Sequence, residues 1–225
     1  MKLLVLDVEG TLFQTRFRLP GATIDSTIWQ ALANALGEGA IAAEVATHHR
    51  WDRGEYESYL AWMKDTIRIH REYGLTDALF GEVIAAAEYH VGVVDTLRNI
   101  DRSRFEPVLV TGGFRELAKR VQIDCDITHA FAACEYLFDS QGSLAAFNLL
   151  PCDFEGKLDF VQLLLREYGL SRNDWVFIGD GRNDVPIART APFSIGFNAH
   201  PELASVSSVC LSDFRELLSV LKALR

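Results

Sequence analysis

Four short apolar runs, each followed by a polar turn, predict strands that are buried inside a sheet. The first run, residues 3–6, leads directly into Asp7. The other three cover residues 107–110, 175–178 and 193–197. Because open α/β sheets place their ligands at the carboxyl ends of parallel strands, we expect the turns after these runs to meet at one edge.

Between these runs, apolar residues recur at helical spacing and predict helices. One such stripe extends over residues 158–168, and another over residues 214–221. Strands that alternate with helices indicate an α/β fold with a doubly wound, mostly parallel, Rossmann-like sheet. Residues 135–150 follow a different pattern, which predicts a β-hairpin that turns at residues 139–143.

Residues 14–91 interrupt this alternation and contain no convincing strand. Their caps and apolar stripes predict three helices. The first follows Asp25 or Ser26, the second ends before Gly74, and the third follows Thr76. The second helix is suggested by the spacing of its larger apolar residues, Tyr56, Tyr59, Leu60, Met63 and Ile67.

We therefore expect two domains. A helical cap domain, residues 14–91, is inserted after the first strand, and residues 1–13 and 92–225 form the α/β core. An insertion at this point of the chain lies over the carboxyl edge of the sheet, where it can act as a lid.

The composition fits a globular protein without a membrane or nucleic-acid partner. The 225 residues are 49% hydrophobic and carry a formal net charge of −9, which disfavours binding to nucleic acid or an anionic membrane. No apolar run approaches the roughly 20 residues of a membrane span, and Asp7 interrupts the start too early for a signal peptide. None of the four cysteines form a Cys-x-x-Cys pair, so we expect reduced thiols in a cytoplasmic protein, a monomer or homodimer.

The turns after the apolar runs carry the candidate chemistry. They bring together Asp7 with Glu9, Thr111 with Gly112, Lys157, and Asp180 with Asp184. Taken alone, Asp7 has a simpler interpretation, in which it caps the following turn. Four carboxylates with few cations invite Mg²⁺, which prefers oxygen ligands and a substrate phosphate. Carboxylates, Mg²⁺ and a lysine together are suited to phosphoryl transfer, and the Thr111 hydroxyl and Gly112 amide can bind an oxyanion.

In order and spacing, these residues resemble the four motifs of haloacid-dehalogenase (HAD) superfamily phosphatases, and within them the phosphoserine-phosphatase-like branch. Each motif alone is weak, but four in sequence order are specific. The resemblance covers residues 1–13 and 92–225, and residues 14–91 occupy the position of that branch's cap. The matching segments are Asp7-Val8-Glu9-Gly10-Thr11-Leu12, Val110-Thr111-Gly112-Gly113-Phe114, Glu155-Gly156-Lys157 and Gly179-Asp180-Gly181-Arg182-Asn183-Asp184.

The resemblance implies a role for each motif residue. Asp7 is expected to be the nucleophile that forms an aspartyl-phosphate, and Glu9 the general acid and base. Mg²⁺ is expected on Asp7, the main-chain carbonyl of Glu9 and Asp180, with Asp184 supporting the metal or orienting Lys157. The phosphoryl group is expected on Thr111, Gly112 and Lys157, and Asn183 is expected to touch the substrate or a metal-bound water.

Two departures from the family pattern concern the substrate. Glu9 replaces the more usual Asp, as in relatives that pass phosphate to an alcohol. Residues 13–24 contain Arg16 and Arg18 but no acidic residue, where phosphoserine-type members hold the substrate ammonium with a Glu. A stripe at i, i+4 spacing is a candidate substrate surface, although it also fits a solvated helix face. The stripe consists of Tyr56, Leu60, Lys64 and Arg68.

The resulting hypothesis is a Mg²⁺-dependent phosphomonoester hydrolase that acts on a small phosphorylated metabolite, phosphoserine-like or more anionic. Two alternatives stay open. The first is a phosphotransferase that uses an acceptor alcohol, and the second is an inactive HAD-like protein that binds a phosphorylated ligand. The adjacent residues His48 and His49 point apart on a helix, so we expect surface or partner contacts there instead of a metal site.

Overall fold

The computed structural model describes residues 1–19 and 22–224, which divide into two compact units. The first unit comprises Met1–Gln14, Tyr89–Ala133 and Cys152–Arg225. The second unit comprises Thr15–Glu88 and Cys134–Pro151. This division differs from the predicted one at two places. The hairpin, predicted as part of the core, belongs to the second unit, and residues 14 and 89–91, predicted as part of the cap, belong to the first.

The hairpin joins the second unit because its backbone bonds to helical segments of that unit. Gly142 accepts a hydrogen bond from the Asp77 amide at 2.9 Å, and the Leu144 carbonyl accepts one from Arg71 Nε at 3.0 Å. A β-bridge also links Ser143 to Thr76. These contacts join segments more than 60 residues apart, so a local sequence pattern could not reveal them.

The main sheet has seven strands in the order β6-β5-β4-β1-β7-β8-β9. β1 pairs in parallel with β4 and β7, and the parallel pairing continues from β7 through β8 to β9. β5 and β6 pair antiparallel as the predicted hairpin. The strands are β1 Lys2–Leu6, β4 Phe105–Phe114, β5 His129–Phe138, β6 Leu144–Leu149, β7 Trp175–Gly179, β8 Ser194–Phe197 and β9 Val209–Leu211.

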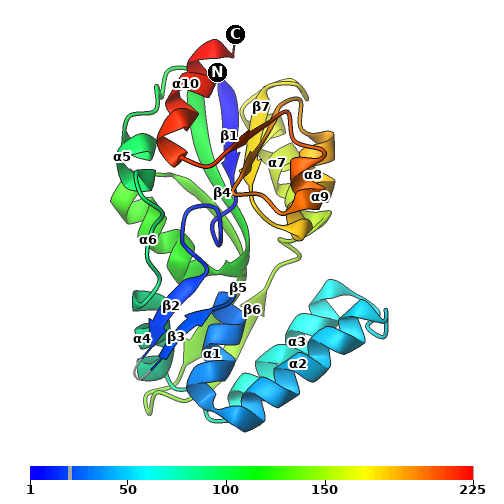
Figure 1. Ribbon diagram of the computed structural model, residues 1–225. Coiled ribbons are helices and arrows are strands. Elements are labelled where there is room, and N and C mark those ends of the chain that lie inside the picture. Colours follow the sequence, from blue (N-terminus) through cyan, green and yellow to red (C-terminus); the bar gives the residue numbers. More distant parts are fainter. Residues whose placement is uncertain (20–21, 225) are drawn as a thin grey trace. The chain divides into compact units, whose positions relative to one another are not determined.

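Helices flank the sheet of the first unit, so the predicted doubly wound α/β fold is confirmed. Figure 1 shows α5 and α6 on one side of β1 and β4, and α7, α8 and α9 on the other. The side chains of residues 3–6 in β1 are fully buried between these layers. The helices are α5 Val93–Arg98, α6 Arg115–Cys125, α7 Gly156–Glu167, α8 Val185–Thr190, α9 Pro201–Ala204 and α10 Leu217–Ala223.

The second unit contains four helices and a short antiparallel hairpin among its described residues. The prediction of no strand between residues 14 and 91 was therefore wrong, because β2 and β3 pair there. Each has only four residues, too few for alternation to stand out, although Phe17 is fully buried. The elements are β2 Arg16–Leu19, β3 Ala22–Asp25, α1 Ile28–Leu36, α2 Glu38–Asp52, α3 Tyr59–Glu72 and α4 Asp77–Ala85.

Side-chain caps set the beginnings of three of these helices. Thr27, and not Asp25 or Ser26, caps α1 and forms a capping box with Gln30. Ser58 and Thr76 cap α3 and α4, the latter as predicted. α2 was not predicted, because its apolar residues are spread around the helix instead of lining one face.

None of the helices over residues 1–19 and 22–224 has both the length and the apolar character needed to cross a bilayer.

Candidate active site

Asp7 begins a tight loop at the carboxyl end of β1. Its amide donates to the Ile178 carbonyl at 3.0 Å, which extends the pairing with β7 and fixes the start of the loop. Gly10 has φ of +83°, and a Cβ at this position would overlap with the carboxylate of Asp180. Glycine is therefore required for the β1 loop to approach the β7 loop closely.

The β7 loop folds around Asp184, which is fully buried. Asp184 Oδ2 accepts hydrogen bonds from the amides of Asp180 and Gly181, both at 3.0 Å. Its other oxygen, Oδ1, accepts a 2.6 Å hydrogen bond from Lys157 Nζ. Asp184 thus contacts Lys157 through one oxygen and the backbone of the β7 loop through the other.

Lys157, near the start of α7, is fully buried and contacts carboxylates from three loops. Its Nζ lies 2.6 Å from Asp7 Oδ1 and from Asp184 Oδ1, and 3.7 Å from Asp153 Oδ1. Burial by itself disfavours the ammonium, but the three carboxylates outweigh it and hold the pKa of Lys157 well above its usual value. The lysine is therefore a fixed positive charge beside Asp7.

The carboxylates of Asp7 and Asp180 lie close together with one hydroxyl between them. Thr11 Oγ1 donates to Asp180 Oδ1 at 2.7 Å, and Asp7 Oδ2 lies 3.5 Å from the same hydroxyl. Burial raises the pKa of Asp7 to about 7, against the opposing effect of Lys157. Burial, together with the neighbouring Asp7, also raises the pKa of Asp180 well above its usual value. A bound cation would favour the ionised form of both carboxylates.

A divalent cation fits the donor set at this edge. Asp7, Asp180 and Asp184 each offer a carboxylate oxygen, and the three oxygens lie within 4.8 Å of one another. Three carboxylates in a buried site, faced by the single ammonium of Lys157, leave negative charge that a hard cation can compensate. The cluster could therefore hold a metal ion through oxygen ligands.

The second predicted motif lies at the end of β4, next to Glu9. Thr111 Oγ1 accepts a 3.1 Å hydrogen bond from the Gly113 amide, which fixes the threonine side chain. A Cβ at Gly113 would lie 3.2 Å from Glu9 Oε2 and 3.4 Å from Thr111 Oγ1. Glu9 and Thr111 therefore face the same point, and both belong to the first unit together with Asp7.

Asp153 is a residue of this cluster that the sequence analysis missed. Its Oδ1 accepts a 2.8 Å hydrogen bond from Asn183 Nδ2, and a Cβ at Gly112 would overlap with its carboxylate. Burial raises the pKa of Asp153, while Lys157 and Asn183 oppose this shift. The one available signal was its i, i+4 spacing to Lys157.

Comparison with known families agrees with this arrangement. The family model described as haloacid dehalogenase-like hydrolase matches residues 1–191, most of the chain. The chain belongs to the haloacid dehalogenase-like hydrolases.

Individual relatives of this hydrolase are phosphoserine phosphatases. The chain is 30% identical to phosphoserine phosphatase SerB2 of Mycobacterium tuberculosis over 216 residues, which are 94% of this chain and 47% of that protein. It thus spans about half the length of that relative. It is 25% identical to the phosphoserine phosphatase of Lactococcus lactis over 221 residues, 98% of this chain and 94% of that protein.

Solved structures show the same fold. A phospho-aspartyl intermediate analogue of phosphoserine phosphatase superposes with a TM-score of 0.73 at 18% identity, and the match covers 97% of this chain and 98% of that one. Together with the relatives, this confirms the predicted resemblance to the phosphoserine-phosphatase-like branch of the haloacid dehalogenase-like hydrolases.

Four of the predicted substrate residues of this hydrolase, Arg16, Tyr56, Lys64 and Arg68, lie in the second unit, whereas Asn183 lies in the first. Tyr56, Lys64 and Arg68 line an open hollow of about 440 Å³, but Tyr56 precedes α3, so the prediction that it shares a helical stripe with the other two was wrong. The Tyr56 hydroxyl and Arg68 both bond to Asp65, at 2.6 and 2.7 Å. Arg16 is mostly exposed and lies 3.6 Å from Asp25.

Proposed function

We propose that this hydrolase removes the phosphoryl group from a small phosphorylated metabolite through an aspartyl-phosphate on Asp7. The observation that carries the proposal is the position of Asp7, buried at a strand end with Lys157 Nζ 2.6 Å away and Asp180 alongside. A buried carboxylate held by an ammonium at the edge of an α/β sheet is suited to attack a phosphoryl group.

In the proposed reaction, one Asp7 oxygen attacks phosphorus while the other stays oriented by Lys157. Lys157 and the Thr111 hydroxyl then hold the phosphoryl oxygens, whose charge must be stabilised as the bond to the leaving oxygen breaks. The hydrogen bond from the Gly113 amide keeps Thr111 in place for this contact. The Gly112 backbone can approach an oxyanion closely because it carries no side chain.

Proton transfer in the proposed reaction belongs to Glu9. Its carboxylate lies beside Gly113 and Thr111, close to where the leaving oxygen would depart. Glu9 would protonate that oxygen and then take a proton from the water that hydrolyses the aspartyl-phosphate. Asn183, held by Asp153, would donate a hydrogen bond to the substrate.

The proposed cofactor is Mg²⁺, held by the carboxylates of Asp7 and Asp180 with Asp184 in support. Bound there, it would neutralise charge on the phosphoryl oxygens. The donor set is entirely oxygen, which suits a hard cation.

Phosphate release from p-nitrophenyl phosphate tests the proposal. We expect turnover with Mg²⁺, its loss with EDTA, and loss of roughly 10³-fold or more in Asp7→Asn, because the amide cannot form the acyl-phosphate. Asp159→Asn is the matched control, since Asp159 is exposed on α7. Wild-type turnover in Asp7→Asn would exclude the covalent route, and binding of phosphate esters without turnover would indicate a ligand-binding protein.

A separate experiment identifies the molecule that accepts the phosphoryl group from the proposed aspartyl-phosphate. With acceptor alcohols in the assay, a hydrolase releases all phosphate to water, whereas a phosphotransferase forms the new phosphate ester. Quantifying both products by ³¹P NMR distinguishes the two reactions, and we expect water to be the acceptor.

A further inference from the structure

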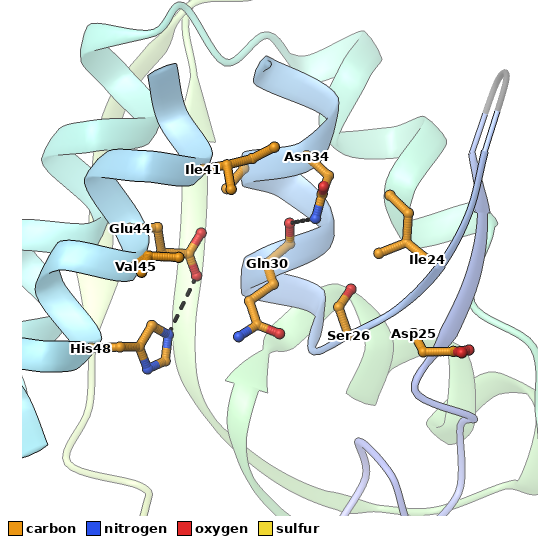
Figure 2. Close-up of a pocket in the computed structure, with 10 residues that line it drawn as sticks. Ile24, Asp25, Ser26, Gln30, Asn34, Ile41, Glu44, Val45 and His48 are labelled. Atoms are coloured by element: carbon orange, nitrogen blue, oxygen red, sulfur yellow. Dashed lines mark hydrogen bonds and ion pairs between the residues drawn. The ribbon is translucent and has the colours of Figure 1, made fainter. Parts of the chain in front are cut away.

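A pocket between α1 and α2 buries polar groups that have no hydrogen-bond partner among the described residues. Figure 2 shows Glu44 and His48 on α2 across from Gln30 and Asn34 on α1, with Ser26 just before α1. The cavity measures about 190 Å³, several times the roughly 30 Å³ of one water. All of its lining residues belong to the second unit, whereas Asp7 belongs to the first.

Glu44 is the decisive residue of this pocket. Its side chain is 3% exposed, yet neither carboxylate oxygen has a hydrogen-bond partner in the described part of the chain. His48 Nε2 lies 3.7 Å from Glu44 Oε1, which is beyond hydrogen-bonding distance. A carboxylate buried without donors costs several kcal/mol, so its presence beside a cavity calls for an explanation.

A second unpartnered group points to the same explanation. The Ser26 hydroxyl is also buried without a hydrogen-bond partner among the described residues, although the Ser26 amide donates to the Thr15 carbonyl at 2.8 Å. Two unsatisfied polar groups thus share one cavity that a small ligand could fill. We propose that this pocket binds a small molecule that carries a protonated amine.

The charges around the pocket select this chemistry. An ionised carboxylate only accepts hydrogen bonds, and an ammonium supplies three donors. Asp25 at the rim is paired with Arg16 at 3.6 Å, so Glu44 supplies the charge of the pocket. No Lys or Arg lies among the described lining residues, so a carboxylate or phosphate on the ligand would find no strong cation inside the pocket. Ile24, Ile41 and Val45 provide apolar walls for a short carbon chain. The pocket therefore fits a simple amine or amino alcohol better than an amino acid.

Calorimetric titration with ethanolamine tests the proposal, with ethylene glycol as a probe of similar size that lacks the amine. We expect saturable binding of ethanolamine only, at least tenfold weaker in Glu44→Gln and unchanged in Glu82→Gln, whose side chain is exposed on α4. Absence of saturable binding, or equal affinity in Glu44→Gln, would overturn the proposal. This binding arm does not depend on the proposed phosphatase activity.

A folding control accompanies the titration. The melting temperature of Glu44→Gln should equal or exceed that of the wild type, so lost binding reflects the lost charge. If that variant is unfolded, Ser26→Ala replaces it, and we expect ethanolamine binding at least threefold weaker. Unchanged affinity in a folded Ser26→Ala would then count against the pocket.

The amine could belong to a free ligand or to the leaving group of the substrate. Steady-state kinetics with phosphoethanolamine and p-nitrophenyl phosphate separate these sources. If the amine is part of the substrate, Glu44→Gln raises KM for phosphoethanolamine alone, and ethanolamine competes with it. If the ligand is free, ethanolamine binds Glu44 whether or not substrate is present. Either kinetic result supports the amine site. If the calorimetric titration shows no saturable binding of ethanolamine, the proposal is wrong whatever the kinetics show.

Discussion

The strand-end cluster of the first unit and the pocket of the second unit bury polar groups differently. In the cluster at the strand ends, Lys157 lies 2.6 Å from both Asp7 and Asp184, so these two carboxylates have a cationic partner. In the second unit, Ser26, Glu44 and His70 each bury at least one polar atom without a hydrogen-bond partner in the described chain. The difference is what the two proposals require, since a catalytic cluster is held by its own contacts and a ligand site keeps hydrogen-bonding capacity for its ligand.

The largest expected effect comes from the proposed acid and base of the first unit. Glu9→Gln should slow hydrolysis of the aspartyl-phosphate by about 10²–10⁴-fold, because the attacking water loses its proton acceptor. The phosphoenzyme should then accumulate and be visible by intact-mass spectrometry. Turnover at the wild-type rate would show that another group moves the proton.

Breaking the paired cluster should also destabilise the first unit. Lys157→Met leaves the carboxylates of Asp7 and Asp184 buried without their ammonium, so the free energy of unfolding should fall by about 3–5 kcal/mol. Urea denaturation measures this loss, and Lys119→Met, exposed on α6, is the control. An unchanged midpoint would mean that the carboxylates are satisfied without the lysine.

The link between Asp153 and Asn183 should have a smaller, kinetic effect. An ionised Asp153 can only accept hydrogen bonds, so it holds the side-chain amide of Asn183 with its Nδ2 toward Asp153. An Asn at position 153 can donate as well as accept, so the Asn183 amide could bind with either its nitrogen or its oxygen toward position 153. Asp153→Asn should raise KM about tenfold, the value of one charge-assisted hydrogen bond, with little change in kcat. In an Asn183→Ala background the same substitution should have little further effect, since Asp153 acts through Asn183. Full additivity in that double mutant would argue for a direct role of Asp153.

The first unit was the more predictable of the two for a physical reason. Its buried strands are continuous apolar runs, and the parallel arrangement brings their ends together, so Asp7, Thr111 and Asp180 could be placed at one edge from the sequence. Asp153 was not predicted as part of the site, because it lies in an irregular segment before α7, where no periodicity indicates the direction of a side chain.

The second unit was less predictable because its buried polar residues carry no pattern. α2 is polar on several sides, so Glu44 looked like an ordinary surface residue although it is 2% exposed. His48 was expected to make surface or partner contacts, and the sequence did not indicate that it lines a pocket beside Glu44. Burial in this unit depends on packing between α1 and α2, which helical spacing alone does not specify.

The buried His70 of the second unit should make the stability of the protein depend on pH. It is fully buried, with Nδ1 2.7 Å from the Tyr136 hydroxyl, and burial lowers the pKa of His70 to about 4. Between about pH 6.5 and 4 the unfolded chain therefore binds a proton that the folded chain does not. The stability from His70 is thus present above pH 6.5 and is lost as pH falls, by up to about 1.4 kcal/mol per pH unit.

Urea unfolding at pH 7, 6 and 5 measures this slope. Other groups titrate too, so the comparison is with His70→Gln, in which the His70 contribution should disappear. His49→Gln, exposed on α2, should keep the wild-type slope. Equal slopes in wild type and His70→Gln would show that His70 titrates alike in the folded and unfolded chains.

The smallest expected effect is the change in the free energy of unfolding caused by Glu44→Gln. Its sign distinguishes the two units, because Lys157→Met should destabilise the protein and Glu44→Gln should not. Without ligand, replacing a buried carboxylate that lacks donors by a neutral amide should leave the free energy of unfolding unchanged or raise it by about 1 kcal/mol. With ethanolamine at 100 times the wild-type Kd, the wild type should gain about 2.7 kcal/mol, and a variant that binds at least tenfold more weakly should gain about 1.4 kcal/mol or less, so the order of stability should reverse. Urea denaturation with and without ethanolamine measures both quantities. A loss of stability in Glu44→Gln without ligand, as large as that expected for Lys157→Met, would mean that the carboxylate is already satisfied and that the two units bury charge in the same way.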